Sequence, residues 1–388
     1  MLKRAMLIGI AGACAATALV FAAAASPAAG TSTATAPQSC SNAIQIGILG
    51  PFTGPVASIG TDQLHWAQFF ATTWNKTHKL QITIVQGDTQ LDPAKASVVA
   101  QSFSSNPSIL ATIGPAGSQE VTAVAPILKK AGLAFMSGSA TNVALTNGKL
   151  RGYFFRVVPN DGVQAPTAAS YMMKKLGVGK GSTVMIVDDQ ESYSTGLAGI
   201  VGNVLKKGGV TVDRESISQK TTDFSSLVAK VTGSTKVVFL PFQVASQAQL
   251  FAQQLKAQGK SAVVFGSDGT FDSKKFNVSG NYVSFFAPDV TTIAADRAIT
   301  AAYNKAYPGG TSPFGAPNYV AAQMYATAAT SACKDGKISR DELRLAVAKV
   351  KLGSTILGGP MAFTANGDVA GAKFFVFKIV GGKYTAAP

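Results

Sequence analysis

Two series of short apolar runs, separated by segments with helical periodicity, constrain the fold of this chain most strongly. The runs are rich in β-branched residues and have the length of single strands. They cover residues 44–49, 80–85, 109–113 and 133–136 in the first series, and 182–187, 210–212, 236–240 and 262–266 in the second. Such alternation is typical of parallel βαβ units. The sequence therefore predicts an α/β fold with two doubly wound parallel-sheet lobes.

The intervening segments carry the expected helical pattern. Between the third and fourth runs, Val121, Val124, Ala125 and Leu128 repeat at the spacing of one helix face, and Lys129 follows them. The second series predicts further helices near residues 163–176, 193–207, 223–231 and 244–258.

The connections between the two series predict the domain organisation. Residues 153–164 separate the series, and Pro159 and Asp161 mark a first crossing between lobes. We expect the chain to cross back near Pro288 and to cross again near Gly358. The predicted lobes are residues 42–158 plus 288–357 and residues 159–287 plus 358–388. Three crossings form a three-segment hinge that suits closure by a stiff rotation.

The N-terminal region has the pattern of a secretion signal. Lys3 and Arg4 precede an almost uncharged apolar run, and small residues follow it. Residues 1–30 are therefore predicted to be a signal peptide of an exported protein, located in the periplasm or on the outer face of the cell envelope. A membrane anchor is the alternative, since the run is long enough to span a bilayer. Residues 31–41 are predicted to be a flexible leader, because Thr, Ser, Ala, Pro and Gln cannot form a core.

Charge and composition argue against several classes of protein. The net charge of +15 is spread over singlets and lysine pairs, whereas a nucleic-acid-binding protein concentrates it in one stripe with aromatic residues. His65 and His78 lack the spacing of a zinc site, and the glycines after the first strand do not form G-x-G-x-x-G. Glu120 and Glu191 are the one candidate carboxylate pair, but Glu120 lies in a first helical turn, where an acid is favoured anyway. We expect no catalytic residue, metal, cofactor or nucleic-acid partner.

Small, hydroxyl-bearing residues follow two neighbouring strands of the first lobe. Ser118 lies in the segment GPAGSQE, and Ser139 and Thr141 lie in MSGSATNVALT. Ligands of open α/β sheets bind beyond the carboxyl ends of the strands, where the free N–H groups of helix N-termini can bind an anion. Ordinary helix capping is the alternative role of these residues. The same chemistry at two adjacent strand ends favours a carboxylate-binding site.

The second lobe supplies complementary groups at its own strand ends. Tyr193 follows the first strand of this lobe and could cover a ligand with its ring, and Asp268 follows the fourth and could face an ammonium group. Phe242 and Gln243 follow the third strand, where the ligand side chain would be selected. The alternatives are a turn role for Asp268 and a core role for Phe242.

With these residues in place, the chain resembles the type I solute-binding proteins of ABC transporters, in the branched-chain amino-acid (Leu/Ile/Val) binding group. The resemblance runs from Ile44 to the C-terminus. Its motifs, which match in order and spacing, are IGILGPFTGPVASIG, IGPAGS, LAFMSGSATNVALT, RVVPNDGVQ and DDQESYSTGL.

The resemblance implies the roles of five residues. Ser118, Ser139, Thr141, Tyr193 and Asp268 would hold the charged ends of an amino acid, with Ser139 acting mainly through its backbone. The implied protein is a monomer that captures its ligand by clamshell closure and delivers it to the membrane permease subunits of an ABC transporter.

Departures from the family pattern leave the ligand open. The acidic position is often glutamate, so Asp268 reaches less far, and Ile59 stands in the first loop, where branched-chain binders may have an aromatic residue. The amide of Gln243 makes a strictly aliphatic ligand less certain. A sensor presenting an amide or an aromatic acid to a receptor, and a non-catalytic envelope scaffold, are the alternative functions.

Cys40 and Cys333 are the cysteines outside the signal. Their spacing alone allows either a disulfide or two free thiols. The family resemblance places Cys40 before the first strand, at the end away from the cleft, and Cys333 at the end of a helix that runs back toward the same place. It therefore implies a Cys40–Cys333 disulfide.

Overall fold

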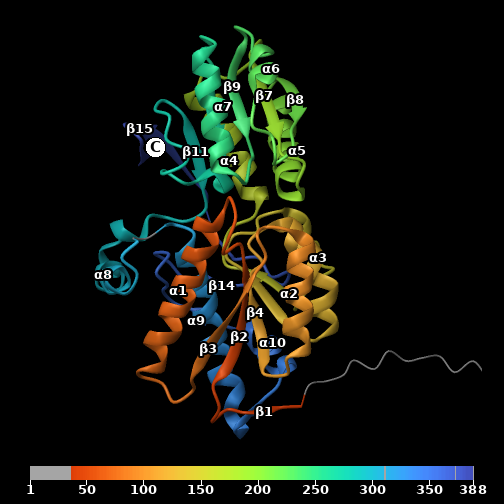
Figure 1. Ribbon diagram of the computed structural model, residues 1–388, viewed down its shortest axis with the longest axis vertical. Coiled ribbons are helices and arrows are strands. Elements are labelled where there is room, and N and C mark those ends of the chain that lie inside the picture. Colours follow the sequence, from red (N-terminus) through yellow and green to blue (C-terminus); the bar gives the residue numbers. More distant parts are fainter. Residues whose placement is uncertain (1–35, 310–311, 372, 388) are drawn as a thin grey trace, which may run out of the picture. The chain divides into compact units, whose positions relative to one another are not determined.

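The computed structural model describes residues 36–309, 312–371 and 373–387 (Figure 1). The predicted signal peptide, residues 1–30, lies outside these residues, as does the first part of the predicted leader. Within the described ranges, no helix combines the length and the apolar character needed to cross a membrane.

The first lobe is built on a five-stranded, fully parallel sheet with the order β3-β2-β4-β5-β6. Four of its strands confirm predicted runs, while β6, only three residues long, lies in the segment predicted to separate the lobes. The strands are β2 (Ile44–Gly50), β3 (Ile82–Asp88), β4 (Ile109–Ile113), β5 (Ala134–Ser137) and β6 (Phe154–Arg156). The strand order along the sheet changes direction between β2 and β4. The carboxyl ends of these two strands therefore form the topological switch point, where ligands bind in such sheets.

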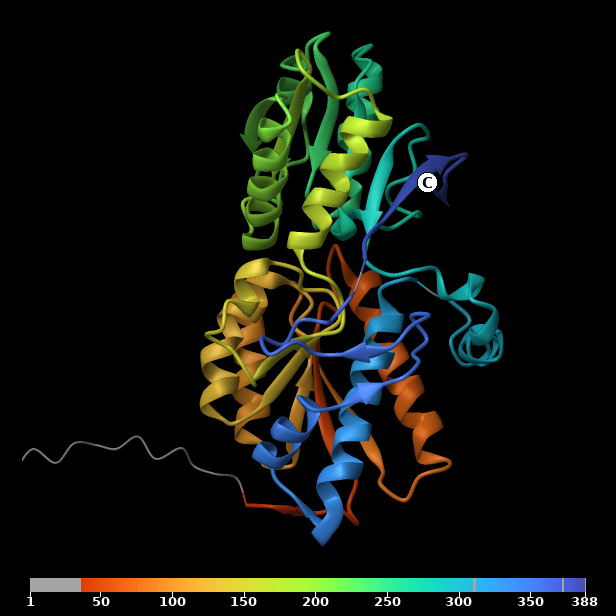
Figure 2. The same cartoon turned by 180° about the vertical axis from the view of Figure 1, so that it is seen from behind.

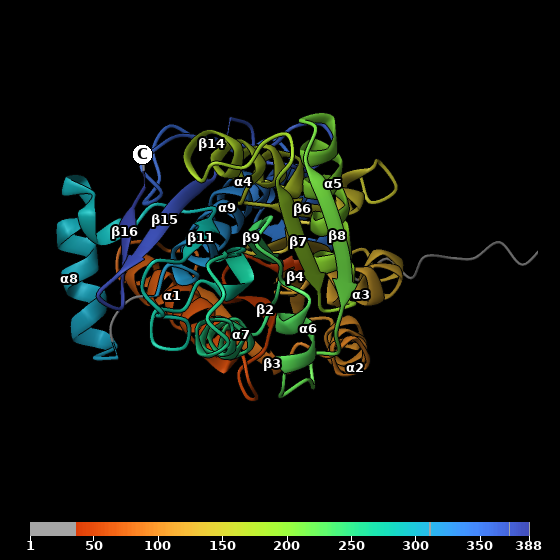
Figure 3. The same ribbon diagram turned by 90° about the horizontal axis from the view of Figure 1, so that it is seen from above.

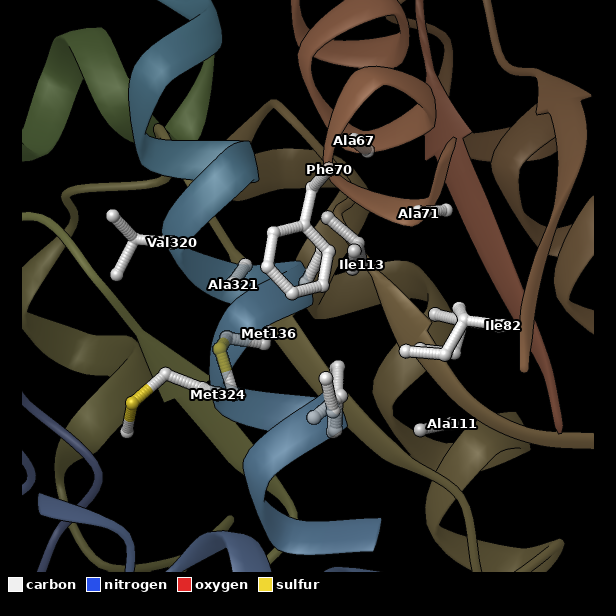
Figure 4. Close-up of a cluster of buried hydrophobic side chains, with 14 of the residues drawn as sticks. Ala67, Phe70, Ala71, Ile82, Ala111, Ile113, Met136, Val320, Ala321 and Met324 are labelled. Carbon is white, nitrogen blue, oxygen red and sulfur yellow. The ribbon is translucent and has the colours of Figure 1, made fainter. Parts of the chain in front are cut away.

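Helices cover both faces of the first sheet because apolar side chains project from it on both sides. One face packs against α1 (Ala57–Asn75), α9 (Gly315–Ala332) and α10 (Arg340–Val347). The other packs against α2 (Pro93–Ser105) and α3 (Ser118–Lys130), whose buried residues include the predicted stripe from Val121 to Leu128. In the core, Phe70 of α1 lies beside Ile113 of β4 and Ala321 of α9 (Figure 4).

The second lobe repeats this plan. Its seven-stranded sheet has the order β16-β15-β11-β10-β9-β7-β8, in which the last five strands in this list are parallel and β15 and β16 are antiparallel. The strands are β7 (Thr183–Asp188), β8 (Thr211–Ser216), β9 (Thr235–Leu240), β10 (Val263–Gly266), β11 (Tyr282–Phe285), β15 (Phe375–Val380) and β16 (Lys383–Ala386). The switch point of this lobe therefore lies between β7 and β9.

Two helices cover each face of the second sheet. One core cluster contains buried residues of α4 (Asp161–Lys175) and α5 (Ser192–Lys207), and another contains residues of α6 (Ser225–Ala229) and α7 (Ala245–Ala257) (Figure 3). The remaining elements are β1 (Gln38–Ser39), β12 (Lys337–Ile338), β13 (Lys351–Leu352), β14 (Met361–Ala362), α8 (Arg297–Ala306) and the 3₁₀ turns η1 (Val143–Thr146), η2 (Asp268–Thr270), η3 (Val290–Thr292), η4 (Ala294–Asp296) and η5 (Cys333–Asp335).

The predicted disulfide is present between Cys40 and Cys333, with Cα atoms 6.0 Å apart. The prediction of a flexible leader through residue 41 is wrong at its end, because Gln38 and Ser39 pair with Ile338 and Lys337. The disulfide and this short antiparallel ladder together fix residues 38–40 to the C-terminal end of α9.

Three crossings connect the lobes, and one residue from each packs into a single apolar cluster. Val158, Ala287 and Phe374 lie together with Phe286 and Phe314. We refer to these five residues as the hinge cluster. Its packing explains how three separate chain segments act as one hinge.

The third crossing falls later than predicted. Met361, Phe363 and Val369 contact the core of the first lobe, and the Arg156 amide donates to Gly367 O at 3.0 Å. The boundary near Gly358 is therefore too early, because residues 361–369 pack with the first sheet before the chain enters β15 (Figure 2). We propose a crossing between Val369 and Phe375.

Candidate functional site

A narrow chamber lies where the strand ends of the two lobes meet. The first lobe contributes Pro51, Val56, Ile59, Leu91, Ala116, Ser118, Ser139 and Phe314, and the second contributes Tyr193, Gln243, Asp268 and Gly269. Five of the seven predicted ligand-binding residues therefore share one chamber: Ser118, Ser139, Tyr193, Gln243 and Asp268.

The N-terminus of α3 supplies hydrogen-bond donors in the first lobe. Gly117 is the N-cap, and the first intrahelical hydrogen bond runs from Val121 N to Gly117 O at 3.0 Å. The amides of Ser118 and Gln119 precede that bond, so they have no intrahelical acceptor. The Ser118 hydroxyl, on the chamber wall, accepts a 3.3 Å hydrogen bond from Asn142 N. This arrangement can bind an anionic group without a cationic side chain.

Ser139 uses its hydroxyl within the protein. The hydroxyl donates to Ala116 O at 2.9 Å and accepts from Gln63 Nε2 at 2.9 Å. The hydroxyl of Ser139 therefore already has one acceptor and one donor within the protein. Gly138 beside it has no room for a side chain, because a Cβ atom there would lie 2.0 Å from Asn318 Oδ1. The small residues of this loop are thus required by close packing against α9.

Two predicted site residues do not line the chamber. The ring of Phe242 is fully buried in the core of the second lobe, beside Phe224, so the prediction that it selects the ligand side chain is wrong and the alternative core role holds. Thr141 is also fully buried, and its carbonyl accepts the amide of Asp161 at 2.8 Å. Thr141 therefore lies behind the chamber, against the start of α4.

Tyr193 and Asp268 form the anionic end of the chamber. The Tyr193 hydroxyl donates to Asp268 Oδ1 at 2.6 Å, and Gln164 Nε2 donates to the same oxygen at 2.6 Å. Both side-chain hydrogen bonds end on Oδ1, which leaves Oδ2 for a ligand. Burial raises the pKa of Asp268 to about 6, against the opposing effect of these two hydrogen bonds. Burial, and then the charge of the Asp268 carboxylate, raise the pKa of Tyr193.

A second acid, Asp161, lies close to Asp268 at the first residue of α4. Burial, and then the charge of Asp268, raise the pKa of Asp161 to about 8, while the nearby Thr141 hydroxyl and Arg156 guanidinium lower it. Within the described residues, neither carboxyl oxygen of Asp161 nor the Thr141 hydroxyl makes a hydrogen bond of regular geometry.

Arg156 holds the loop on which Ser139 and Thr141 lie. Its side chain is fully buried; Nη1 donates to Ala140 O at 3.0 Å and to Asn142 O at 2.9 Å, and Nε forms a 2.7 Å ion pair with Asp368. Because these carbonyls belong to the turn after β5, the guanidinium fixes the path of that turn. Arg156 is a positioning residue that the sequence prediction missed.

The sequence carried a signal for these missed residues. Arg156, Asp161 and Gln164 all fall in the motif RVVPNDGVQ, which the prediction used only for its family resemblance and as a crossing. Asp161 and Gln164 are three residues apart, which places both side chains on one face of α4. The sequence therefore indicated a polar site here, because a charged residue and an amide share one face of a helix that starts at the hinge.

Three of the four groups considered for catalysis, His65, His78 and Glu120, have structural partners. His65 stacks on Tyr307, with ring centroids 4.3 Å apart, and His78 stacks on Trp74 at 3.5 Å. The fully buried Glu120 caps α3 by accepting the Gly117 amide at 2.8 Å. Among the described residues, no group of three or more His, Cys, Asp or Glu side chains is arranged to hold a metal ion.

Two α/β lobes of matching strand order, a hinge of three segments and a chamber at both switch points define a two-lobed protein that binds a small ligand. The chain belongs to the periplasmic binding protein family, whose sequence profile matches residues 43–383.

Known proteins similar to this chain differ in their ligands. Leu/Ile/Val-binding protein homolog 3 of Brucella melitensis is 28% identical over 357 residues, which cover 88% of this chain and 92% of that protein. The substrate-binding protein LivJ of Streptococcus pneumoniae, in complex with isoleucine, is 24% identical with a TM-score of 0.77, and the match covers 89% of this chain and 99% of LivJ. A solute-binding protein of R. palustris in complex with benzoate is 18% identical with a TM-score of 0.77, over 89% of this chain and 95% of that one. The structural matches show a shared fold.

Proposed function

We propose that this protein is the extracytoplasmic binding component of an ABC transporter and that it captures an amino acid in the chamber. One observation carries the proposal. The buried anion of Asp268, held by Tyr193, shares a chamber with the free amides at the N-terminus of α3. A zwitterion has the two charges that these two ends would bind.

The ligand carboxylate would bind at the first lobe, to the amides of Ser118 and Gln119 and to the Ser118 hydroxyl. The ammonium group would bind at the second lobe, to Asp268 Oδ2. Only the closed arrangement of the lobes offers both sets of contacts to one small molecule, so binding would shift the population toward closure.

The chamber wall favours an apolar ligand side chain. Pro51, Val56, Ile59, Leu91 and Phe314 form an apolar lining. Burial of an aliphatic side chain of leucine size contributes roughly 1.5–3 kcal/mol. A branched-chain or similar small amino acid is therefore the best match, and the Brucella relative has a name of the same kind.

The cellular setting follows from the same proposal. Residues 1–30 would direct export, and the monomer would deliver its ligand to the membrane permease subunits of the transporter. Family membership supports a location outside the cytoplasm. The disulfide between Cys40 and Cys333 also supports this location, because disulfides form and persist in oxidising compartments.

A panel of matched ligands tests the proposal. Leucine, isoleucine and valine would be compared with 4-methylpentanoate, which lacks the ammonium group of leucine, and with isopentylamine, which lacks its carboxylate. We expect leucine to raise the unfolding temperature and to bind in calorimetry, because a ligand that binds the native state stabilises it. Both analogues should bind at least tenfold more weakly. Equal binding of 4-methylpentanoate and leucine would refute the ammonium site.

The second candidate is a sensor for an aromatic acid or an amide. The amide of Gln243 on the chamber wall and the benzoate complex of the R. palustris protein favour it. Benzoate and benzamide therefore belong in the same panel, and preference for either over leucine would select this function. A panel without any bound ligand would point to the envelope scaffold.

A further inference from the structure

Gln119 and Gln243 join the two lobes through a reciprocal pair of amide hydrogen bonds. Gln119 Nε2 donates to Gln243 Oε1 at 2.8 Å, and Gln243 Nε2 donates to Gln119 Oε1 at 3.2 Å. Gln119 lies in the first turn of α3 in the first lobe, and Gln243 follows β9 in the second lobe. Both side chains are buried, at 7% and 8% exposure.

The second lobe holds its half of the pair in position. Gln219 Nε2 donates to Gln243 Oε1 at 2.9 Å and to Asp189 Oδ2 at 3.0 Å, and Asp189 Oδ2 also accepts the amide of Gln243 at 3.1 Å. Gln243 is therefore oriented from its own lobe. These contacts orient the Gln243 side chain even when Gln119 is absent. The pair with Gln119 can therefore form as soon as the two lobes close.

Two other polar contacts between the lobes lie at the surface, while a third, from Asn142 Nδ2 to Ser192 O at 2.6 Å, is partly buried. Lys275 Nζ donates to Pro55 O at 2.9 Å, and the Ser58 hydroxyl donates to Asp272 Oδ2 at 3.1 Å, both in exposed settings. Water competes for such groups, and their net contribution is small. In the closed arrangement, water cannot replace either partner of the buried Gln119–Gln243 pair. An amide left unpaired there would bear its full desolvation penalty.

We propose that Gln119 and Gln243 form a latch between the lobes that sets how long a ligand stays in the chamber. The proposal rests on the proposed function, since Gln243 is part of the wall of the chamber that would hold the amino acid. Ligand contacts and latch bonds both require the closed arrangement. The latch therefore slows reopening without contributing to the first encounter.

The latch also disfavours ligand side chains that would donate a hydrogen bond to Gln243. Gln119 and Gln219 already occupy the carbonyl oxygen of Gln243, and Gln119 accepts from its nitrogen. A ligand side chain that donated a hydrogen bond to the carbonyl oxygen of Gln243 would have to displace one of these two donors, whereas an aliphatic side chain leaves both in place. The latch thus explains how an amide on the wall is compatible with an apolar ligand.

A double-mutant cycle with Gln119→Ala, Gln243→Ala and the double variant tests the latch, with leucine as the probe in stopped-flow binding. Each single variant should raise the dissociation rate roughly five- to tenfold, while the association rate stays within about twofold. The double variant should be no worse than the worse single variant, because one truncation already breaks the pair. Gln249→Ala is the matched control: Gln249 exchanges amide hydrogen bonds with Asn277 inside the second lobe, and its dissociation rate should equal that of the wild type.

The outcomes separate the latch from the proposed function. Leucine binding with wild-type dissociation in both single variants, or with multiplicative effects in the double variant, overturns the latch and leaves the function standing. Absence of binding of leucine, isoleucine and valine to the wild type refutes the proposed function. The same cycle is then measured on the unfolding equilibrium constant without ligand, where coupling of about fivefold or more supports the latch and independent effects overturn it.

Discussion

The hydroxyl of Tyr193 and the carboxylate of Asp268 are joined by a 2.6 Å hydrogen bond, although they lie on α5 and on the turn after β10. Asp268 is 3% exposed and Tyr193 is also 3% exposed. A buried carboxylate without a cationic partner is costly, so under the proposed function the ammonium group of the ligand would stabilise this pair.

Asp268→Asn should weaken leucine binding by roughly 1.5–3 kcal/mol, since it removes a charged hydrogen-bond acceptor while keeping the shape of the side chain. Calorimetry with leucine and with 4-methylpentanoate measures the effect. The loss should be confined to leucine; an equal loss for both ligands would show that the substitution disturbs the chamber as a whole.

Binding of leucine should weaken as the pH falls below 6. The pKa of Asp268 is raised to about 6, and the protonated carboxyl cannot pair with an ammonium group. At pH 5 the dissociation constant should be about tenfold higher than at pH 7.5, by proton linkage. The Asp268→Asn variant should show a flat profile over this range, and a wild-type profile equally flat would place the acid elsewhere.

Asp161→Asn should become increasingly stabilising as the pH rises. The pKa of Asp161 is raised from 3.8 to about 8, first by burial and then by Asp268, so the folded protein binds this proton more tightly than the unfolded chain. Wild-type stability therefore declines between these two pKa values as the pH increases, and the variant lacks that decline. The difference in unfolding free energy should grow by roughly 2–4 kcal/mol between pH 5 and pH 8 in urea titrations. A constant difference would contradict the shift.

Gly196→Ala should weaken ligand binding without destabilising the protein. A Cβ atom at Gly196 would lie 2.7 Å from Asn142 Nδ2, whose 2.6 Å hydrogen bond to Ser192 O crosses between the lobes. Asn142 must move away, so we expect a roughly three- to tenfold loss of leucine affinity, on the order of one hydrogen bond.

Gly199→Ala in the same helix is the matched control, because nothing lies within 4 Å of a Cβ atom there. Each alanine should add up to about 1 kcal/mol of stability from helix propensity. Only Gly196→Ala should lose affinity; equal affinities of the two variants would show that the Asn142 contact does not matter for closure.

Removal of the disulfide should destabilise the protein and leave the chamber intact. Cys333 lies at the end of α9, an 18-residue helix, which puts it about 27 Å along the helix from the chamber residue Phe314. The Cys40→Ser/Cys333→Ser double variant should lose roughly 2–5 kcal/mol of stability, measured by thermal and urea unfolding, with leucine affinity within twofold of the wild type. A large loss of affinity would show that α9 transmits the change to the site.

The strands and helices with clear periodicity could be predicted from the sequence, and so could the two-lobed plan. Strand β6 could not, because three residues carry too short an alternation to separate from a loop. The antiparallel ladder at Gln38 and Ser39 could not either, since its partner strand lies almost 300 residues away along the chain.

The positions of Ser118, Tyr193 and Asp268 on the chamber wall were predictable, because each lies in a segment that follows a strand. The motif RVVPNDGVQ drew attention to Arg156, but the role of this residue was not predictable, because it depends on an ion pair with Asp368, 212 residues away. The contact made by Gln119 could not be predicted for the same reason. Its neighbour Ser118 has a recognisable role from local sequence, while the partner of Gln119 becomes visible only when both lobes are placed.

Phe314 belongs to the hinge cluster and also to the wall of the chamber. A larger ligand that contacted Phe314 would therefore also contact a residue of the hinge cluster. A substitution of Phe314 that changed ligand selectivity would also change the packing of the hinge cluster and hence the equilibrium between open and closed lobes. Ligand selectivity and lobe closure therefore cannot evolve independently at this side chain.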